Sequence, residues 1–256
     1  MHPVYVHIKK ELSPFYAEEE ASAMAKWISS DILHLSTLEL YTGKDMNFST
    51  KEWEELEDIL RRLKQREPLQ YILQEASFCG MSFHVEQGVL IPRPETEELV
   101  EWIISDYREA GQVRILDIGT GSGCIPVSLA QLLPEAQVSS CDVSAEALRI
   151  AAMNIKRYGD KVTLFCADIL KEELPECQVD VLVSNPPYIT ESERTDMEAN
   201  VLDWEPELAL FVPDSDPLRF YRRIAWKGLD WLSEGGALYF EINRAYGAEP
   251  VHYADI

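Results

Sequence analysis

The segment Ser184-Asn185-Pro186-Pro187-Tyr188 gathers groups that suit the binding of a planar amine. Its two prolines lack an amide hydrogen, so the chain leaves any sheet here and forms a stiff loop with exposed carbonyls. The Asn185 side-chain oxygen and the Pro186 carbonyl can both accept hydrogen bonds, and together they match an NH2 group with two hydrogens. Tyr188 offers a flat face to a planar group. We predict that this loop holds a planar nitrogen; the alternative is a plain loop that ends a strand.

Acceptors placed in this way would raise the reactivity of an amide nitrogen, which is low because its lone pair is delocalised into its carbonyl. Hydrogen bonds from the two amide hydrogens return electron density to the nitrogen and aim its lone pair at an electrophilic methyl group. Orientation of this kind can lower a barrier by roughly 7–11 kcal/mol. No strong general base is required, since the proton can leave once the nitrogen has begun to bond.

Residues 116–123, Leu-Asp-Ile-Gly-Thr-Gly-Ser-Gly, form a glycine-rich turn between a predicted strand and a predicted helix. Glycines there let the backbone turn tightly and come within contact distance of a ligand. The GxGxG spacing differs from the dinucleotide fingerprint, and no Gly-Lys-Ser/Thr follows as in a P-loop. Asp117 precedes the glycines, and Asp142 ends the next predicted strand. A carboxylate at the end of the second strand of a doubly wound sheet accepts hydrogen bonds from the ribose hydroxyls of a nucleoside ligand.

Asp168 and Ile169 follow the third predicted strand and have two interpretations. The Asp168 carboxylate can reach the amino group of an adenine while Ile169 packs on its ring. Asp168 can equally cap a short helix that begins before Leu170. The sequence leaves both interpretations open.

Short apolar strands alternate with helices after residue 112. This alternation predicts an α/β fold with a parallel, doubly wound sheet covered on both faces. Ligands bind such sheets beyond the carboxyl ends of the strands, which is where the glycine turn and the 184–188 loop fall. The expected strands are 113–118, 138–141, 162–165, 179–183 and 237–242, and the expected helices are 124–133, 145–157 and 217–232.

The first seventy-five or so residues are predicted to be helical. Ser13-Pro14 is expected to begin the first helix, because a proline at the first helical position loses no hydrogen bond. Ser49 followed by Glu52 is a capping-box pattern that begins a later helix.

Residues 77–90 have the short period and the glycines of a β-hairpin, and Glu95 or Thr96 is expected to cap the helix that follows. The chain is therefore predicted to have three parts. These are a helical domain over residues 1–75, which would recognise the substrate, a hairpin linker over 76–92 and an α/β domain over 93–256.

The formal net charge of −22 bears on possible partners. A surface this acidic repels phosphate backbones, because nucleic-acid binding draws its non-specific affinity from Lys and Arg, so no direct nucleic-acid binding is expected. No apolar stretch is long enough to span a bilayer. The five cysteines form no CxxC pair, so neither a disulfide framework nor a metal site is expected, and the protein should be cytoplasmic.

Two further stretches are more specific: residues 67–73, Glu-Pro-Leu-Gln-Tyr-Ile-Leu, and residues 89–97, Val-Leu-Ile-Pro-Arg-Pro-Glu-Thr-Glu. With the glycine turn and the 184–188 loop, they make the chain resemble the protein-(glutamine) methyltransferases that modify peptide chain release factors, the PrmC/HemK family. Many class I methyltransferases share the glycine turn, and several nitrogen methyltransferases share Asn-Pro-Pro-Tyr. The resemblance extends from about residue 15 to about residue 248.

The resemblance implies a Rossmann-like, class I methyltransferase domain that uses S-adenosylmethionine, preceded by a small helical domain and a β-hairpin linker. It implies methyl transfer to the N5 nitrogen of the glutamine in the Gly-Gly-Gln loop of a release factor, and we expect the enzyme to be a monomer. The residues implied to bind the cofactor are Asp117, Gly119, Thr120, Gly121, Ser122, Gly123, Asp142, Asp168, Ile169 and Asn185. Those implied to bind the glutamine are Asn185, Pro186, Pro187 and Tyr188, of which Asn185, Pro186 and Tyr188 would be catalytic.

Three other functions stay open. One is methylation of a glutamine in another protein, such as a ribosomal protein. A second is methylation of adenine N6 in nucleic acid, because an exocyclic amine on a planar ring poses the same geometry. The third is a truncated chain that binds cofactor or partner without turnover. Members of the family continue past Asn243 through another helix and a strand pair, so we expect two strands to be missing and the edge at 237–242 to be unpaired.

Overall fold

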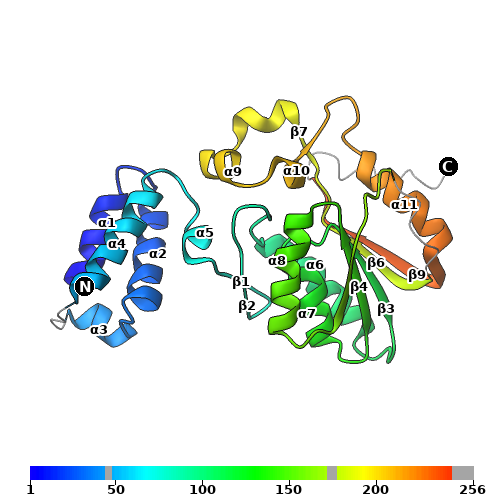
Figure 1. Ribbon diagram of the computed structural model, residues 1–256, viewed down its shortest axis with the longest axis horizontal. Coiled ribbons are helices and arrows are strands. Elements are labelled where there is room, and N and C mark those ends of the chain that lie inside the picture. Colours follow the sequence, from blue (N-terminus) through cyan, green and yellow to red (C-terminus); the bar gives the residue numbers. More distant parts are fainter. Residues whose placement is uncertain (44–47, 172–177, 244–256) are drawn as a thin grey trace. The chain divides into compact units, whose positions relative to one another are not determined.

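The computed structural model describes residues 1–43, 48–171 and 178–243. The chain divides into two compact units, one formed by Met1–Leu73 and one that begins at Gln74 (Figure 1). Each unit has its own apolar core. No helix among the described residues is long and apolar enough to cross a membrane.

The first unit is helical, as predicted. Its core is built from apolar side chains that all the longer helices contribute, with Ile8, Leu12, Ile28 and Leu60 almost wholly buried. Its elements are α1 (Pro3–Leu12), α2 (Glu18–Trp27), the π-helical turn η1 (Ile28–Ile32), α3 (Thr37–Thr42), α4 (Thr50–Leu63) and α5 (Leu69–Leu73).

Two of the predicted helix starts have different outcomes. Ser49 and Glu52 form the predicted capping box before α4, with Glu52 N donating to Ser49 Oγ at 3.3 Å and Ser49 N donating to Glu52 Oε2 at 2.6 Å. The start expected at Ser13-Pro14 is wrong, because the chain is already helical from Pro3 and Ser13 is the C-cap. His2 provides the cap that the sequence did not suggest: its Nδ1 accepts a hydrogen bond from Val4 N at 3.2 Å.

The second unit contains the predicted parallel, doubly wound sheet, in the order β5-β4-β3-β6-β9 (Figure 1). Helices α6, α7 and α8 pack on one face of it, and α11 packs on the other. The strands are β3 (Arg114–Ile118), β4 (Gln137–Asp142), β5 (Val162–Cys166), β6 (Val179–Ser184) and β9 (Leu232–Phe240). The helices are α6 (Pro94–Tyr107), α7 (Cys124–Leu132), α8 (Ala145–Arg157) and α11 (Arg219–Trp231). The α/β fold predicted from the sequence is thereby confirmed.

The last described strand, β9, begins at Leu232 rather than at residue 237 as expected. Its pairing with β6 shifts register between Val179 and Val181, and Gly235 takes a left-handed φ of 79° within the shift. Among the described residues of this unit β9 pairs with β6 alone. The expectation of missing strands concerns the stretch after Asn243, which lies outside the described residues.

Smaller elements flank the sheet. The predicted hairpin is confirmed as β1 (Ala76–Phe78) antiparallel to β2 (Met81–Phe83), and it belongs to the second unit. Helix α6 begins at Pro94 with Arg93 as its N-cap, so the cap expected from Glu95 or Thr96 is wrong. Between β6 and α11 come β7 (Ile189–Thr190), the 3-10 helix η2 (Glu191–Asp196), α9 (Ala199–Trp204), α10 (Glu207–Leu210) and β8 (Phe211–Val212).

Candidate active site

A cavity lies at the carboxyl ends of β3, β4 and β6, where a doubly wound sheet binds its ligands. It joins segments that are far apart in the sequence. The predicted residues that line it are Gly119, Thr120, Gly121, Ser122, Asp142, Asp168, Ile169, Asn185, Pro186 and Pro187. Of the other predicted residues, Asp117, Gly123 and Tyr188 do not line it.

The glycine turn presents bare backbone to this cavity. The amides of Gly119 and Thr120 donate to the Cys141 carbonyl at 2.9 and 3.1 Å, which fixes the turn to the end of β4. Gly119 and Gly121 have φ values of 86° and 53°, and a Cβ on either would meet no protein atom within 4 Å. The space that these missing side chains leave suits the close approach of a ligand.

Gly123 serves helix packing. It caps α7 with a φ of 81°, and a Cβ there would stand 3.2 Å from the Cβ of Ala151 on α8. This approach is tighter than most side-chain contacts, so the last glycine of the turn lets α7 and α8 pack closely.

Asp142 links the turn to the second strand. Its Oδ2 accepts a hydrogen bond from Gly121 N at 3.0 Å, and its Oδ1 accepts one from Ser144 N at 2.8 Å. Burial raises the pKa of this carboxyl, although the backbone N–H groups partly counter that rise. Each carboxylate oxygen has a further lone pair, so Asp142 can also accept the two hydroxyls of a ribose.

Asp117 lies beneath the turn with none of its surface exposed. Its Oδ2 accepts a hydrogen bond from Ser140 Oγ at 2.6 Å. Burial raises the pKa of Asp117 to about 7, and the Ser140 hydrogen bond lowers it only in part. The folded protein therefore disfavours the ionised form of Asp117 at neutral pH.

Replacing Asp117 with asparagine should therefore stabilise the ligand-free protein at high pH. Because the folded-state pKa lies above the unfolded value near 3.8, the wild-type protein loses stability as the pH rises from about 4 to 7. An asparagine escapes this loss, so D117N should gain about 2–4 kcal/mol at pH 8 and less at pH 5. Urea unfolding at both values measures the difference, with D230N at an exposed position as the control. An equal effect of D117N at pH 5 and pH 8 would contradict the argument.

The 184–188 loop is held where β6 ends. Ser184 Oγ donates to the Ile118 carbonyl at 2.6 Å, so the loop and the glycine turn share an anchor. Asn185 Nδ2 donates to Thr96 Oγ1 at 3.2 Å, and the Tyr188 hydroxyl donates to Glu241 Oε1 at the same distance. Asn185 thus has its NH2 group engaged by the protein.

A third wall of the cavity comes from the stretch after the hairpin, which the sequence singled out without a role. Val89, Leu90, Pro92, Arg93 and Thr96 all line the cavity. Opposite them, residues 206, 208 and 209 from the start of α10 line it as well.

Glu205 joins these two walls. Only 5% of it is exposed, yet its carboxylate accepts hydrogen bonds from Ile91 N at 3.0 Å and from the Arg93 guanidinium. Nothing in the local pattern around Glu205 predicts this contact.

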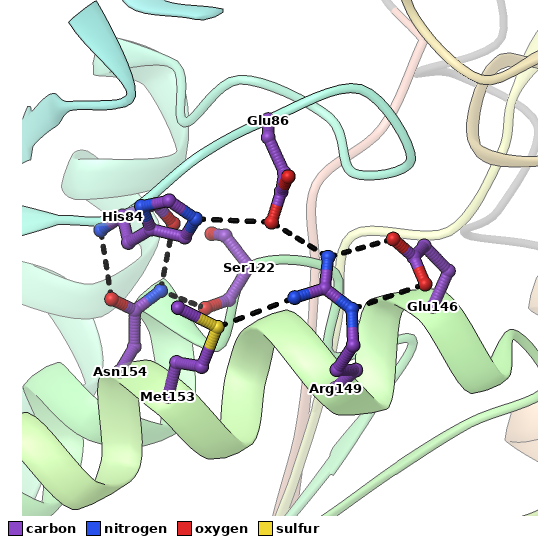
Figure 2. A network of polar contacts seen from close by, with 7 residues as sticks. All are labelled: His84, Glu86, Ser122, Glu146, Arg149, Met153 and Asn154. Carbon is purple, nitrogen blue, oxygen red and sulfur yellow. Dashed lines mark hydrogen bonds and ion pairs between the residues drawn. The ribbon is translucent and has the colours of Figure 1, made fainter.

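A polar network around Asn154 and Arg149 on α8 holds the stretch that follows the hairpin (Figure 2). The Asn154 side chain accepts from His84 N at 2.8 Å and donates to the carbonyls of His84 and Ser122 at 2.9 and 2.8 Å. Arg149 contacts Glu86 and Glu146 nearby. One buried amide therefore connects the hairpin exit with the glycine turn (Figure 2).

The parallel sheet, with bare glycine backbone after its first strand and the Asp142 carboxylate at the end of its second, belongs to a class I methyltransferase domain, a class that uses S-adenosylmethionine. Residues 96–203 match the model of the methyltransferase small domain, and residues 5–73 match that of the PrmC N-terminal domain. The chain belongs to the family of release factor glutamine methyltransferases, which confirms the resemblance seen in the sequence.

Two relatives of that name illustrate the match. The one from Bacteroides thetaiotaomicron is 49% identical over 257 residues, which span 100% of this chain and 92% of the relative. The one from Flavobacterium psychrophilum is 42% identical over 243 residues, which span 94% of this chain and 85% of the relative.

Proposed function

We propose that this enzyme methylates the N5 side-chain nitrogen of a protein glutamine, and that this glutamine belongs to the Gly-Gly-Gln loop of a peptide chain release factor. One observation carries the proposal: Asn185 and Pro186 line the same cavity as the glycine turn. An amide-binding loop and a nucleoside-binding turn therefore face one space. The names of the relatives support the choice of release factor as the substrate.

S-adenosylmethionine supplies an electrophilic methyl group on a sulfonium. The protein residues hold and orient the partners: residues 119–122 and Asp142 bind the nucleoside, while Asn185 and Pro186 accept hydrogen bonds from the glutamine NH2. The methyl group would pass from the sulfonium to the glutamine nitrogen, and the nitrogen would give up one proton to water. The products are N5-methylglutamine and S-adenosylhomocysteine.

The remaining parts of the proposal concern the partner. The helical domain over residues 1–75 would recognise the release factor, the linker over 76–92 would follow it, and residues 93–256 would carry out the transfer. Because translation factors work in the cytoplasm, the enzyme would act there, and it would do so as a monomer without binding nucleic acid.

The test is transfer of labelled methyl from S-adenosylmethionine to purified release factor. We expect label on the wild-type factor and none on a factor whose Gly-Gly-Gln glutamine is replaced by alanine. DNA and total ribosomal protein serve as alternative acceptors. Label on either of those but not on the factor would overturn the proposed substrate. Cofactor binding without label on any acceptor would indicate a binding protein without turnover.

A further inference from the structure

The carboxylate of Glu241, just past the end of β9, joins three distant parts of the second unit. Thr96 Oγ1 on α6 donates to Glu241 Oε2 at 2.6 Å, and the Tyr188 hydroxyl donates to Glu241 Oε1 at 3.2 Å. Asn185 Nδ2 in turn donates to Thr96 Oγ1 at 3.2 Å. The chain of donors therefore runs from the Asn185 amide through the Thr96 hydroxyl to Glu241, which in its ionised form accepts hydrogen bonds and donates none. Burial raises the pKa of Glu241, and hydrogen bonds from Thr96, Tyr188 and Asn185 itself to its carboxylate counter that rise.

The direction of these bonds decides which way the Asn185 amide faces. An asparagine side chain can present either its oxygen or its NH2 group by a half-turn, and the two ends have nearly the same shape. The Thr96 hydroxyl has one hydrogen, and Glu241 takes it. Only lone pairs are then left to face Asn185, so its NH2 group must point to Thr96 and its oxygen must point the other way.

The orientation matters because a glutamine NH2 group needs an acceptor. If Asn185 turned around, its NH2 group would face the NH2 of the substrate, and neither could accept from the other. The backbone Pro186 carbonyl cannot turn in this way. Asn185 is therefore the member of the amide-binding pair that needs an orienting partner.

We propose that Thr96, itself held by Glu241, is a positioning residue that keeps the Asn185 oxygen directed toward the acceptor amide. This inference rests on the proposed function, because it assumes that the 184–188 loop binds the NH2 group of a glutamine. Thr96 is 3% exposed and lines the cavity, so its hydroxyl is shielded from competing water.

Further contacts at the end of β9 hold the loop in the same place. Glu241 N donates to the Ser184 carbonyl at 3.2 Å, and Asn243 Nδ2 donates to the Tyr188 carbonyl at 3.2 Å. The Tyr221 hydroxyl on α11 donates to the Glu241 carbonyl at 3.0 Å. The Glu241 backbone is thus fixed independently of its side chain, and T96V should not displace the loop as a whole.

The experiment compares T96V, which removes the hydroxyl at nearly constant shape, with T96S, which keeps it. We expect T96V to lower kcat by about 10- to 100-fold, while T96S stays within about threefold of wild type. The Kd for S-adenosylmethionine should change by less than about threefold in both. A T96V enzyme with wild-type kcat, or a T96S enzyme as slow as T96V, would overturn the inference.

Two additions separate orientation from a general structural role. E241Q, which also changes the acceptor of the Tyr188 hydroxyl, should lower kcat as well. The double variant T96V/E241Q should be no slower than the slower single variant, because T96V then adds no second loss at the Asn185 amide. Additive losses would instead indicate independent structural damage. All variants are assayed on whichever acceptor the wild-type enzyme methylates, so the wrong substrate and the wrong positioning residue give different results.

A measurement without turnover tests the same point. The side-chain NH2 signals of Asn185 can be identified in a nitrogen-15 NMR spectrum by their loss in N185D. In T96V the hydrogen that donates to Thr96 Oγ1 should exchange with water about tenfold faster or more than in the wild type, because that acceptor is gone. In T96S it should exchange as in the wild type. Unchanged exchange in T96V would refute the inference even if no acceptor protein were methylated.

Discussion

Replacing Asn185 with alanine should lower kcat for methyl transfer by about 10²- to 10³-fold, the loss typical of removing one preorganised group that acts on the reacting centre. The side chain supplies one of the two acceptors for the glutamine NH2 group, and its NH2 end is already committed to Thr96. Without it, the amide nitrogen is held by the Pro186 carbonyl alone and its lone pair is no longer aimed. Since most of the cofactor contacts remain, the Kd for S-adenosylmethionine should rise less than about fivefold.

Single-turnover transfer of labelled methyl and calorimetric titration of the cofactor separate the two effects. N200A is the matched control, because Asn200 lies on α9 and does not line the cavity. If the Kd of N185A for S-adenosylmethionine rose by as large a factor as its kcat fell, Asn185 would serve the cofactor. The assignment of Asn185 to the acceptor would then fail.

The arrangement of the sheet could be predicted because it depends on local patterns. Short apolar strands alternate with helices, and parallel strands bring their carboxyl ends to one edge. The glycine turn after β3, Asp142 at the end of β4 and the loop after β6 therefore had to meet at a common site. Their meeting in one cavity follows from topology alone.

The helix starts show where local patterns mislead. Proline at a first helical position is a real signal, and both Pro3 and Pro14 carry it. The structure uses Pro3, with His2 as the cap, and a histidine is an uncommon choice for that position. The early start of β9 was missed for a similar reason: Ser233, Glu234 and two glycines lack the apolar pattern of a strand, and pairing with β6 across a shifted register overrides it.

The supporting contacts of the site could not be predicted, because they join residues that are remote in the sequence. Thr96 and Glu241 are separated by 145 positions, and Ile91 and Glu205 by 114. A single sequence gives no register between such segments. Thr96 or Glu95 was expected to cap α6, which is a common use of a threonine at the start of a helix. The Thr96 hydroxyl instead donates to the Glu241 carboxylate just past β9.

Replacing Asp142 with alanine should produce the opposite kinetic pattern to N185A. Its carboxylate can accept both ribose hydroxyls, and hydrogen bonds to a charged group contribute about 1.5–3 kcal/mol each. Two such bonds correspond to a rise in the Kd for S-adenosylmethionine of about 100-fold or more. At saturating cofactor the kcat should stay within a few-fold of wild type, because no contact to the glutamine is lost.

D230A is the control for this variant, since it removes an exposed carboxylate and changes the net charge equally. Asp142 also accepts hydrogen bonds from Gly121 N and Ser144 N, so D142A loosens the glycine turn as well. D142N separates these effects because its oxygen can keep one backbone bond while the second ribose acceptor is lost, and it should bind cofactor with an intermediate Kd. If D142A bound cofactor as tightly as D230A, the nucleoside would have to be held by other residues of the cavity, and Asp142 would be a turn-stabilising residue only.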